Sequence, residues 1–278
     1  MPELPEVETV CRGLNQVTSG LVIKNSEILL SRTLAYPETD DRFTSQIEGQ
    51  KIIKWHRRGK YLLAQLSKGW LGVHLRMTGQ LLWVNSDSEL HKHTRVRLFF
   101  AQEQELRFVD TRTFGKFWLV EHKRPIEEVI TGLQKLGVEP FSPEFTTEYF
   151  LQRLGKSRRQ IKTILLDQNL VAGVGNIYAD ESLFKAGIHP TTISRDITPE
   201  QGDKLRQAII DVLQKSIEAG GTTFSDFLQI TGVNGNYGGM ALVYGRKDQP
   251  CHVCGTKIEK IKIGGRSSHF CPQCQKLS

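Results

Sequence analysis

The sequence predicts an α+β protein of two domains, with a β-rich amino-terminal half that opens with a helix and a helical carboxy-terminal half that ends in a cysteine-bearing hairpin. Short runs of alternating apolar residues fill the chain from Leu21 to about Val120. A helical period follows a stretch with prolines and glycines between Pro125 and Pro143. Four of the five cysteines lie near the carboxy terminus. The length of 278 residues also exceeds that of most single domains.

These changes in residue pattern along the chain set the expected domain boundaries. We expect an amino-terminal domain over residues 2–135, a hinge over 136–150, a helical domain over 151–240 and a four-cysteine module over 241–278. Within the helical domain, residues 232–239 are rich in glycine and predict a mobile loop.

A helix is predicted at the amino terminus. Leu4, Val7, Cys11 and Leu14 recur at helical spacing, and the helix is expected to end no later than Gly20. Cys11 stands apart from the other cysteines, so we expect it to be a buried, unreactive thiol.

The following segments are predicted to be strands. They share alternation and an enrichment in branched and aromatic residues, and turn signals separate them. The clearest are Lys51–Trp55, Tyr61–Leu66, Thr94–Phe100 and Glu105–Val109. Several short strands of this kind are typical of an antiparallel sandwich or barrel.

The second half contains two helical signals. A helix is predicted from Thr198 to Ala219, because a capping box with proline at the first position precedes it and two glycines follow. Residues 165–181 predict a helix, turns broken by glycines, and a second helix. These glycines do not indicate a dinucleotide-binding loop, since no βαβ unit surrounds them and a third glycine is missing. At the start of the second helix, Asn176 could cap the helix and at the same time hold a phosphate, or it could cap the helix alone.

Composition limits the class of protein. The formal net charge of +7 favours a polyanionic partner. Apolar runs are too short to cross a bilayer and no signal-peptide core is visible, so we expect no membrane partner and a cytoplasmic location. We also expect a monomer.

The amino terminus is the first candidate for chemistry. An initiator methionine is ordinarily removed before proline, so we expect Pro2 to begin the mature protein. Its secondary amine could attack an electrophilic carbon and form an iminium, because an α-amino pKa of about 7.7–8.0 leaves a nucleophilic fraction near neutrality. Glu3 and Glu6 would share one side of a helix and could move protons. Alternatively, the proline starts the helix and the glutamates complement its dipole.

The four clustered cysteines predict a metal site. They are spaced as two C-x-x-C pairs separated by sixteen residues, namely Cys251, Cys254, Cys271 and Cys274. This spacing is typical of a four-thiolate zinc ribbon, and it leaves no open coordination position, so we expect one structural Zn2+. The alternative of two disulfides needs an oxidising compartment. His252 and His269 lie nearby and are not expected to be ligands.

The segment between the cysteine pairs predicts a basic β-hairpin. Residues 257–266 alternate charged and apolar side chains. From Arg246 to Ser278 the sequence has seven basic and two acidic residues, which supplies +5 of the total charge. We therefore expect this hairpin to contact a phosphate backbone.

Together these features closely resemble the formamidopyrimidine-DNA glycosylase family. The resemblance is carried by the opening Pro-Glu-Leu-Pro-Glu-Val-Glu-Thr, the Asn176 segment and the cysteine module, and it covers residues 2–276. It implies an amino-terminal β-sandwich, a helix-two-turns-helix domain with a zinc finger, and damaged double-stranded DNA between them. It also implies base-excision repair of oxidised purines such as 8-oxoguanine and formamidopyrimidines. In this chemistry the amino-terminal proline attacks C1′, the base leaves, and the iminium permits strand scission by β,δ-elimination, an AP lyase activity.

The resemblance also implies roles for individual residues. Pro2 would be the nucleophile, Glu3 the proton donor and Glu6 an auxiliary catalytic residue. Lys60 matches a phosphate-binding lysine close to the lesion. The remaining matches are DNA contacts, namely His74, Met77, Arg112, Phe114, Asn176 and Arg266.

Three of these DNA contacts have a shared role in the family. Met77, Arg112 and Phe114 are similar to a trio that fills the gap left by the extruded base. On strand periodicity alone, Met77 and Phe114 would be core residues, and His74 a surface or packing residue. The region 220–240 corresponds to a loop that contacts the flipped base, and we assign no base-specific residue there.

Two alternative functions remain. Endonuclease VIII shares the proline and the finger but excises oxidised pyrimidines. It opens with a sequence like Pro-Glu-Gly-Pro-Glu, whereas this chain has Leu4, and the segment around Arg112 also favours the purine enzyme. A non-catalytic DNA-binding relative is expected to lack Pro2 or Glu3, and both are present.

Overall fold

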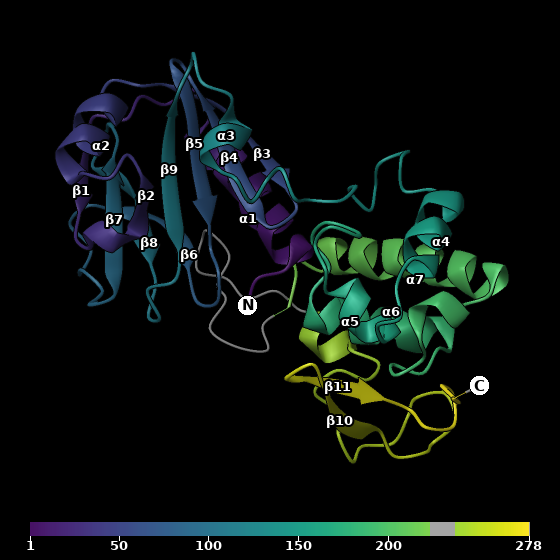
Figure 1. Cartoon of the computed structure of the whole chain (residues 1–278). Coiled ribbons are helices and arrows are strands. Elements are labelled where there is room, and N and C mark those ends of the chain that lie inside the picture. Colours follow the sequence, from purple (N-terminus) through teal and green to yellow (C-terminus); the bar gives the residue numbers. More distant parts are fainter. Residues whose placement is uncertain (223–236, 278) are drawn as a thin grey trace. The chain divides into compact units, whose positions relative to one another are not determined.

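The computed structural model describes residues 1–222 and 237–277, which form two compact units. The first unit comprises Met1–Gln134 and the described part of Ala219–Asn236, and the second comprises Lys135–Glu218 and the described part of Tyr237–Ser278. Figure 1 labels the helices and strands of each unit.

The first unit is a β-sandwich. Its four-stranded sheet has the order β1-β7-β8-β6 and its five-stranded sheet the order β2-β9-β5-β4-β3. Among the described pairs, β2 with β9 is parallel and the others are antiparallel. The strands are β1 (Asn25–Ile28), β2 (Leu34–Tyr36), β3 (Ile52–Arg58), β4 (Tyr61–Leu66), β5 (Gly69–His74), β6 (Gln80–Asn85), β7 (Thr94–Phe99), β8 (Gln104–Val109) and β9 (Lys116–Glu121). The sandwich, of the two predicted alternatives, is therefore confirmed.

One hydrophobic core lies between the two sheets. Phe108 of β8 and Phe117 of β9 belong to different sheets, and their rings meet edge to face with centroids 4.9 Å apart. Val7 of the first helix joins the same core. Trp55 of β3 is also fully buried there, and its indole nitrogen donates to the Thr18 hydroxyl at 2.9 Å. The helices of this unit are α1 (Leu4–Thr18), α2 (Asp40–Ile47), α3 (Ile126–Val129) and the 3-10 helix η1 (Ser31–Thr33).

Strand register places two connections at the same end of the sandwich. In the five-stranded sheet His74 pairs with Lys116, and in the four-stranded sheet Gln80 pairs with Val109. The β5–β6 connection and the β8–β9 connection therefore both cross from one sheet to the other at this end. These two loops contain three of the residues for which the sequence predicts a DNA contact.

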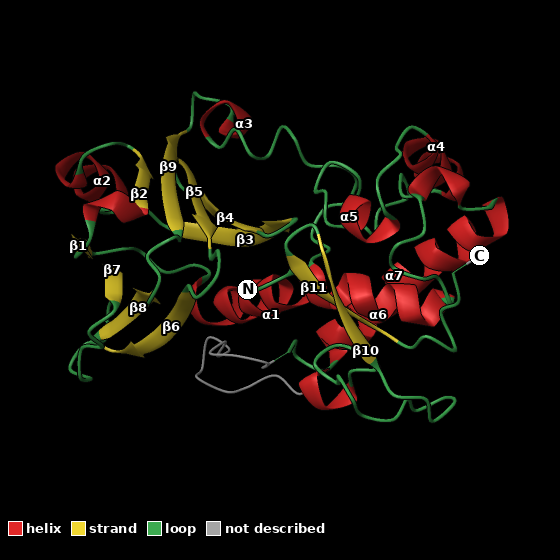
Figure 2. Ribbon diagram, turned by 60° about the horizontal axis from the view of Figure 1, so that its bottom comes forward, coloured by secondary structure: helices red, strands yellow, loops and turns green. Residues whose placement is uncertain are grey.

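The second unit consists of helices and a two-stranded hairpin over its described residues (Figure 2). Helix α6 packs on α7, where the Tyr178 and Ser216 hydroxyls lie 2.5 Å apart, and β11 packs on α6. The predicted capping box is present, because Thr198 and Gln201 each donate a backbone N–H to the other's side-chain oxygen. The elements are α4 (Thr147–Gly155), α5 (Ile161–Leu165), α6 (Asn176–Ala186), η2 (Ser194–Asp196), α7 (Pro199–Glu218), η3 (Tyr237–Met240), β10 (Glu259–Ile263) and β11 (Arg266–Phe270).

The loop predicted over residues 232–239 lies mostly outside the described residues. Its last part belongs to the 3-10 helix η3, and Tyr237 there is buried. Over the described ranges, none of the helices combines the length and apolarity that a membrane span needs.

Candidate functional site

The amino-terminal candidates are buried at the start of α1. Pro2 is buried, and Glu3 and Glu6 are each 2% exposed. Oε2 of Glu6 accepts a hydrogen bond from the backbone nitrogen of Glu3 at 2.8 Å. Its Oε1 accepts from the backbone nitrogen and the hydroxyl of Thr222, at 2.8 and 3.0 Å. The Glu6 carboxylate thus links Glu3 to Thr222, which is distant in sequence. Gly221, with φ of +82°, allows this segment to approach the Glu6 side chain.

Lys60 and His74 lie at one edge of the five-stranded sheet. Lys60 occupies the turn between β3 and β4, where Gly59 takes the left-handed conformation that this tight turn requires. Tyr61, the next residue, pairs with His74 on β5, and the two rings meet edge to face at 4.6 Å. Both Lys60 and His74 are 8% exposed.

The His74 ring is held in the neutral form. Burial, and then the positive charges of Arg76 and Lys60, lower the pKa of His74 to about 3. Nδ1 accepts a hydrogen bond from the backbone nitrogen of Arg76 at 3.0 Å, which assigns the ring proton to Nε2. His74 can therefore donate one hydrogen bond through Nε2 without bringing a charge.

Met77, Arg112 and Phe114 lie on the two loops that cross between the sheets. Met77 is 37% exposed and Phe114 is 50% exposed, although strand periodicity alone predicted core positions. The Arg112 guanidinium lies 5.1 Å from the centroid of the Phe114 ring, within cation–π range. The prediction from periodicity is wrong for both apolar residues, because they lie in loops and not in strands.

Asn176 differs from its predicted role as a helix cap. Gly175 is the N-cap of α6, and Asn176 is the first helical residue. The Asn176 side chain donates instead to the backbone oxygen of Ser267 at 3.0 Å. Ser267 follows Arg266, an exposed residue that comes directly after the Gly264-Gly265 turn of the finger hairpin. The structure thus brings Asn176 next to the strand that carries Arg266.

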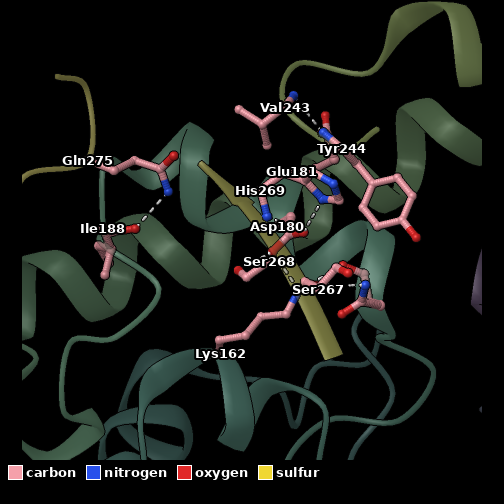
Figure 3. Close-up of polar contacts among 11 residues, drawn as sticks. Lys162, Asp180, Glu181, Ile188, Val243, Tyr244, Ser267, Ser268, His269 and Gln275 are labelled. Carbon is pink, nitrogen blue, oxygen red and sulfur yellow. Dashed lines mark hydrogen bonds and ion pairs between the residues drawn. The ribbon is translucent and has the colours of Figure 1, made fainter. Parts of the chain in front are cut away.

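A buried polar network joins α6 to this hairpin (Figure 3). Lys162 is fully buried and donates to the Asp180 carboxylate at 2.5 Å and to the Asn176 backbone oxygen at 2.9 Å. Asp180 also accepts from the Ser268 hydroxyl at 2.8 Å and from the backbone nitrogen of His269 at 2.9 Å. Because both buried charges have partners, the network holds β11 against α6 with its charges balanced.

Glu181, next along α6, fixes a second segment. Its carboxylate accepts hydrogen bonds from three consecutive backbone nitrogens, at 2.8 Å from Leu242, 2.9 Å from Val243 and 2.8 Å from Tyr244. Burial raises the pKa of Glu181 even though these hydrogen bonds act in the opposite direction. Glu181 therefore anchors the chain where it enters the finger.

The four cysteines of the finger form a cluster that fits a tetrahedral metal ion. Their sulfur atoms all lie within 4.8 Å of one another, and all five cysteines of the chain are free of disulfides. Three of the sulfur separations are 3.5, 3.5 and 3.9 Å. Zn–S bonds of about 2.3 Å in a tetrahedron separate the sulfurs by about 3.8 Å. Hydrogen bonds from Thr256 lower the pKa of Cys254 to about 6, whereas burial raises the pKa of Cys271 and of Cys274 in the same cluster.

Several residues with structural importance for these sites were not identified from the sequence. Asp110 and Thr78 join the two exposed loops, and Lys162, Asp180 and Glu181 hold the finger. One signal was available for Asp110, because an aspartate directly after a strand commonly accepts hydrogen bonds from the backbone of the following turn. A fully buried lysine has no comparable signal, since lysine is ordinarily exposed.

Comparisons with known proteins cover almost the whole chain. A family model described as "Formamidopyrimidine-DNA glycosylase N-terminal domain" matches residues 1–117. The corresponding "H2TH domain" matches residues 136–227, and a "Zinc finger found in FPG and IleRS" matches 248–277. A formamidopyrimidine-DNA glycosylase of Rippkaea orientalis is 62% identical over 281 residues, which cover 99% of this chain and 100% of the relative.

Solved structures of a Lactococcus lactis protein have the same fold. A complex between a variant of the Lactococcus lactis Fpg and DNA containing Fapy-dG matches with a TM-score of 0.92 and 35% identity. The match covers 99% of this chain and 100% of the other. A complex of the Lactococcus lactis Fpg with DNA containing an abasic site matches with a TM-score of 0.91 and 35% identity over the same shares.

The sandwich, the helical unit and the four-thiolate finger define a DNA-binding repair glycosylase with one structural zinc site. The chain belongs to the formamidopyrimidine-DNA glycosylase family, whose members act in base-excision repair.

Proposed function

We propose that this protein removes oxidised purines, 8-oxoguanine and formamidopyrimidines, from double-stranded DNA and then cleaves the abasic strand. The observation that carries the proposal is the start of α1, where Pro2 is buried and the next residue, Glu3, donates its backbone N–H to the buried Glu6 carboxylate. The Lactococcus lactis complexes with Fapy-dG and abasic-site DNA support the two parts of the activity.

The chemistry begins once Met1 has been removed. The unprotonated amine of Pro2 attacks C1′ of the damaged nucleotide, and the bond from C1′ to the base breaks with its electron pair going to the base, which takes up the proton that the Pro2 nitrogen releases. Glu3 delivers a proton as the sugar ring opens, which leaves an iminium between Pro2 and C1′. Loss of a proton from C2′ then expels the 3′ phosphate, and a second elimination expels the 5′ phosphate.

Glu6 acts by positioning in this scheme. Both of its carboxylate oxygens already accept hydrogen bonds, from Glu3 and from Thr222, so its contacts orient the backbone around the nucleophile. Glu6 thereby keeps Pro2 and Glu3 in register with the segment at Thr222.

The remaining residues bind the DNA. Lys60, Arg266 and Asn176 contact phosphates, and neutral His74 donates to a phosphate oxygen through Nε2. Met77, Arg112 and Phe114 fill the space left by the flipped base, which recovers part of the few kcal/mol that flipping costs.

Paired substrates test the proposal. Single-turnover base release is measured on duplexes that differ only in the lesion, with 8-oxoguanine opposite cytosine in one and an oxidised pyrimidine opposite its normal partner in the other. We expect faster release of the purine, followed by strand cleavage. Faster release of the pyrimidine would assign an endonuclease VIII-like specificity, and binding without release of either base would assign a non-catalytic role.

A further inference from the structure

The two exposed loops of the sandwich meet over a shared apolar surface. Gly79 ends the β5–β6 loop and Gly115 ends the β8–β9 loop. A Cβ added at Gly79 would lie 2.8 Å from the Phe108 ring, and one at Gly115 would lie 2.3 Å from it. The backbone at each glycine therefore packs closely against the Phe108 ring, so the two loops are neighbours that share one contact residue.

A single buried carboxylate spans both loops. Asp110 is 1% exposed, and its Oδ2 accepts a hydrogen bond from the backbone nitrogen of Gly115 at 2.8 Å. Its Oδ1 accepts from the Thr78 hydroxyl at 2.5 Å and from the backbone nitrogen of Arg112 at 3.2 Å. The Arg112 nitrogen also lies 3.1 Å from the Thr78 oxygen, which closes a triangle between the loops.

These anchors lie directly beside the exposed side chains. Thr78 follows Met77, and Asp110 binds the backbone of the loop that carries Arg112 and Phe114. Between those two residues, Thr113 has φ of +59°, a left-handed conformation that is costly for a branched residue without support. Hydrogen bonds from both ends of this loop to one carboxylate supply that support.

We propose that Asp110 is a positioning residue that joins the Met77 loop and the Arg112–Phe114 loop into one rigid DNA-inserting element. The consequence for DNA, that the three side chains enter the duplex together, rests on the proposed function. Positional errors of about 1 Å in such groups can cost about 100-fold in rate, so a shared anchor matters for base flipping.

The chemistry of the anchor requires a carboxylate. The groups that donate to it are two backbone N–H groups and one hydroxyl, and every one of them needs an acceptor. In Asp110→Asn the amide nitrogen replaces one acceptor by a donor, which breaks the contact to at least one loop. In Thr78→Val the shape is kept and the link between the loops is lost.

Hydrogen exchange of the free protein tests the coupling without relying on activity. We expect the amides of residues 75–79 and 110–115 both to exchange about tenfold faster or more in Asp110→Asn, and again in Thr78→Val. Glu105→Gln is the matched control, because Glu105 is a fully buried carboxylate on β8 that pairs with Arg97 and Arg107. Faster exchange of only the mutated loop, or equal acceleration of both loops in the control, would overturn the proposal.

Activity on two substrates tests the consequence. Single-stranded abasic DNA has no paired base to displace, so Asp110→Asn should cleave it within about twofold of the unaltered protein while releasing 8-oxoguanine from duplex at least about tenfold more slowly. Equal losses on both substrates would contradict a positioning role in flipping. An unaltered protein that acts on neither substrate would refute the proposed function, and the exchange result would still decide the coupling.

Discussion

The two units hold their candidate functional residues by different means. In the first unit the loops stand on a sandwich whose core includes Trp55, Phe108 and Phe117. The apolar cluster at the finger is small, includes Phe184 of α6 and contains two of the cysteines, Cys251 and Cys271. A module of this size cannot bury enough apolar surface to fold alone, and a metal supplies the missing stability. The difference implies that the chemistry of the first unit and the DNA binding by the finger can be lost separately.

The largest difference between the effect on base release and the effect on DNA binding is expected for Glu3→Gln. The change keeps the size of the side chain and removes its acid function, so base release should fall by about 10²–10⁴-fold. DNA binding at a fixed salt concentration should stay within about threefold, because phosphate contacts supply most of the affinity. Single-turnover kinetics and fluorescence anisotropy measure the two quantities.

The control for Glu3→Gln is Glu8→Gln on the same helix. Glu8 forms one ion pair with the exposed Arg12 and one with Arg57, whose side chain is only 10% exposed, so the change costs helix stability without altering the acid function of Glu3. Its base release should therefore stay within about threefold of the unaltered protein. A comparable loss in both variants would mean that helix stability, and not the acid group, explains the effect.

Removal of zinc should act on the finger alone. Chelation, or Cys254→Ser, should weaken DNA binding by about tenfold to 100-fold, because the finger loses the fold that presents Arg266. All four tryptophans, Trp55, Trp70, Trp83 and Trp118, lie in the first unit, so tryptophan fluorescence should not change. Metal analysis alongside the fluorescence spectrum checks both statements.

The matched control for the metal site is Cys11→Ser. Cys11 is buried in α1, and burial raises the pKa of its thiol to about 12, so it is not suited to metal binding. This variant should retain one zinc ion per chain. Loss of zinc from it, or a fluorescence change on chelation, would contradict the independence of the two units.

The neutral His74 predicts a pH effect confined to the first unit. Its pKa of about 3 in the folded state lies below the unfolded value near 6.5, so the unfolded state binds the additional proton and stability falls as pH drops below about 6.5. Between pH 7.5 and 5, His74 should account for a loss of about 2 kcal/mol in the free energy of unfolding. In His74→Asn, whose side-chain oxygen can replace Nδ1 as acceptor, this loss should be absent.

Urea unfolding followed by tryptophan fluorescence at the two pH values measures this difference. Other titrating groups contribute equally to both proteins and cancel. If acidification lowered the free energy of unfolding of the two proteins equally, the conclusion that His74 is buried in its neutral form would be wrong.

The smallest expected effect concerns Arg266. It lies at the exposed tip of the finger hairpin, so Arg266→Ala should weaken binding to damaged and undamaged duplex alike, by about tenfold. The slope of log K against log salt should decrease by about 1, because one phosphate contact is lost. An effect on damaged DNA alone would indicate a base-specific role.

Local chemistry allowed much of this structure to be predicted from the sequence. The capping box at Thr198 defined the start of α7, and the paired C-x-x-C spacing identified the metal site. The choice between sandwich and barrel could not be made from alternation, since it depends on which strands pair over long distances. The same applies to Asp110, whose partners meet only because strand register brings two loops together.

Asn176 illustrates a limit of local reasoning. Its position suggested a cap, yet its side chain bonds to Ser267, which is distant in sequence. A contact between a helix and a hairpin far along the chain cannot be derived from the residues around either one.

Mapping of a borohydride-trapped adduct tests the central claim most directly. The protein is incubated with duplex containing 8-oxoguanine opposite cytosine in the presence of borohydride, digested, and examined by tandem mass spectrometry. We predict that the sugar remnant is attached to the nitrogen of Pro2 in a peptide that lacks Met1. An adduct on Lys60 or any other lysine, or full activity in protein that retains Met1, would contradict the account.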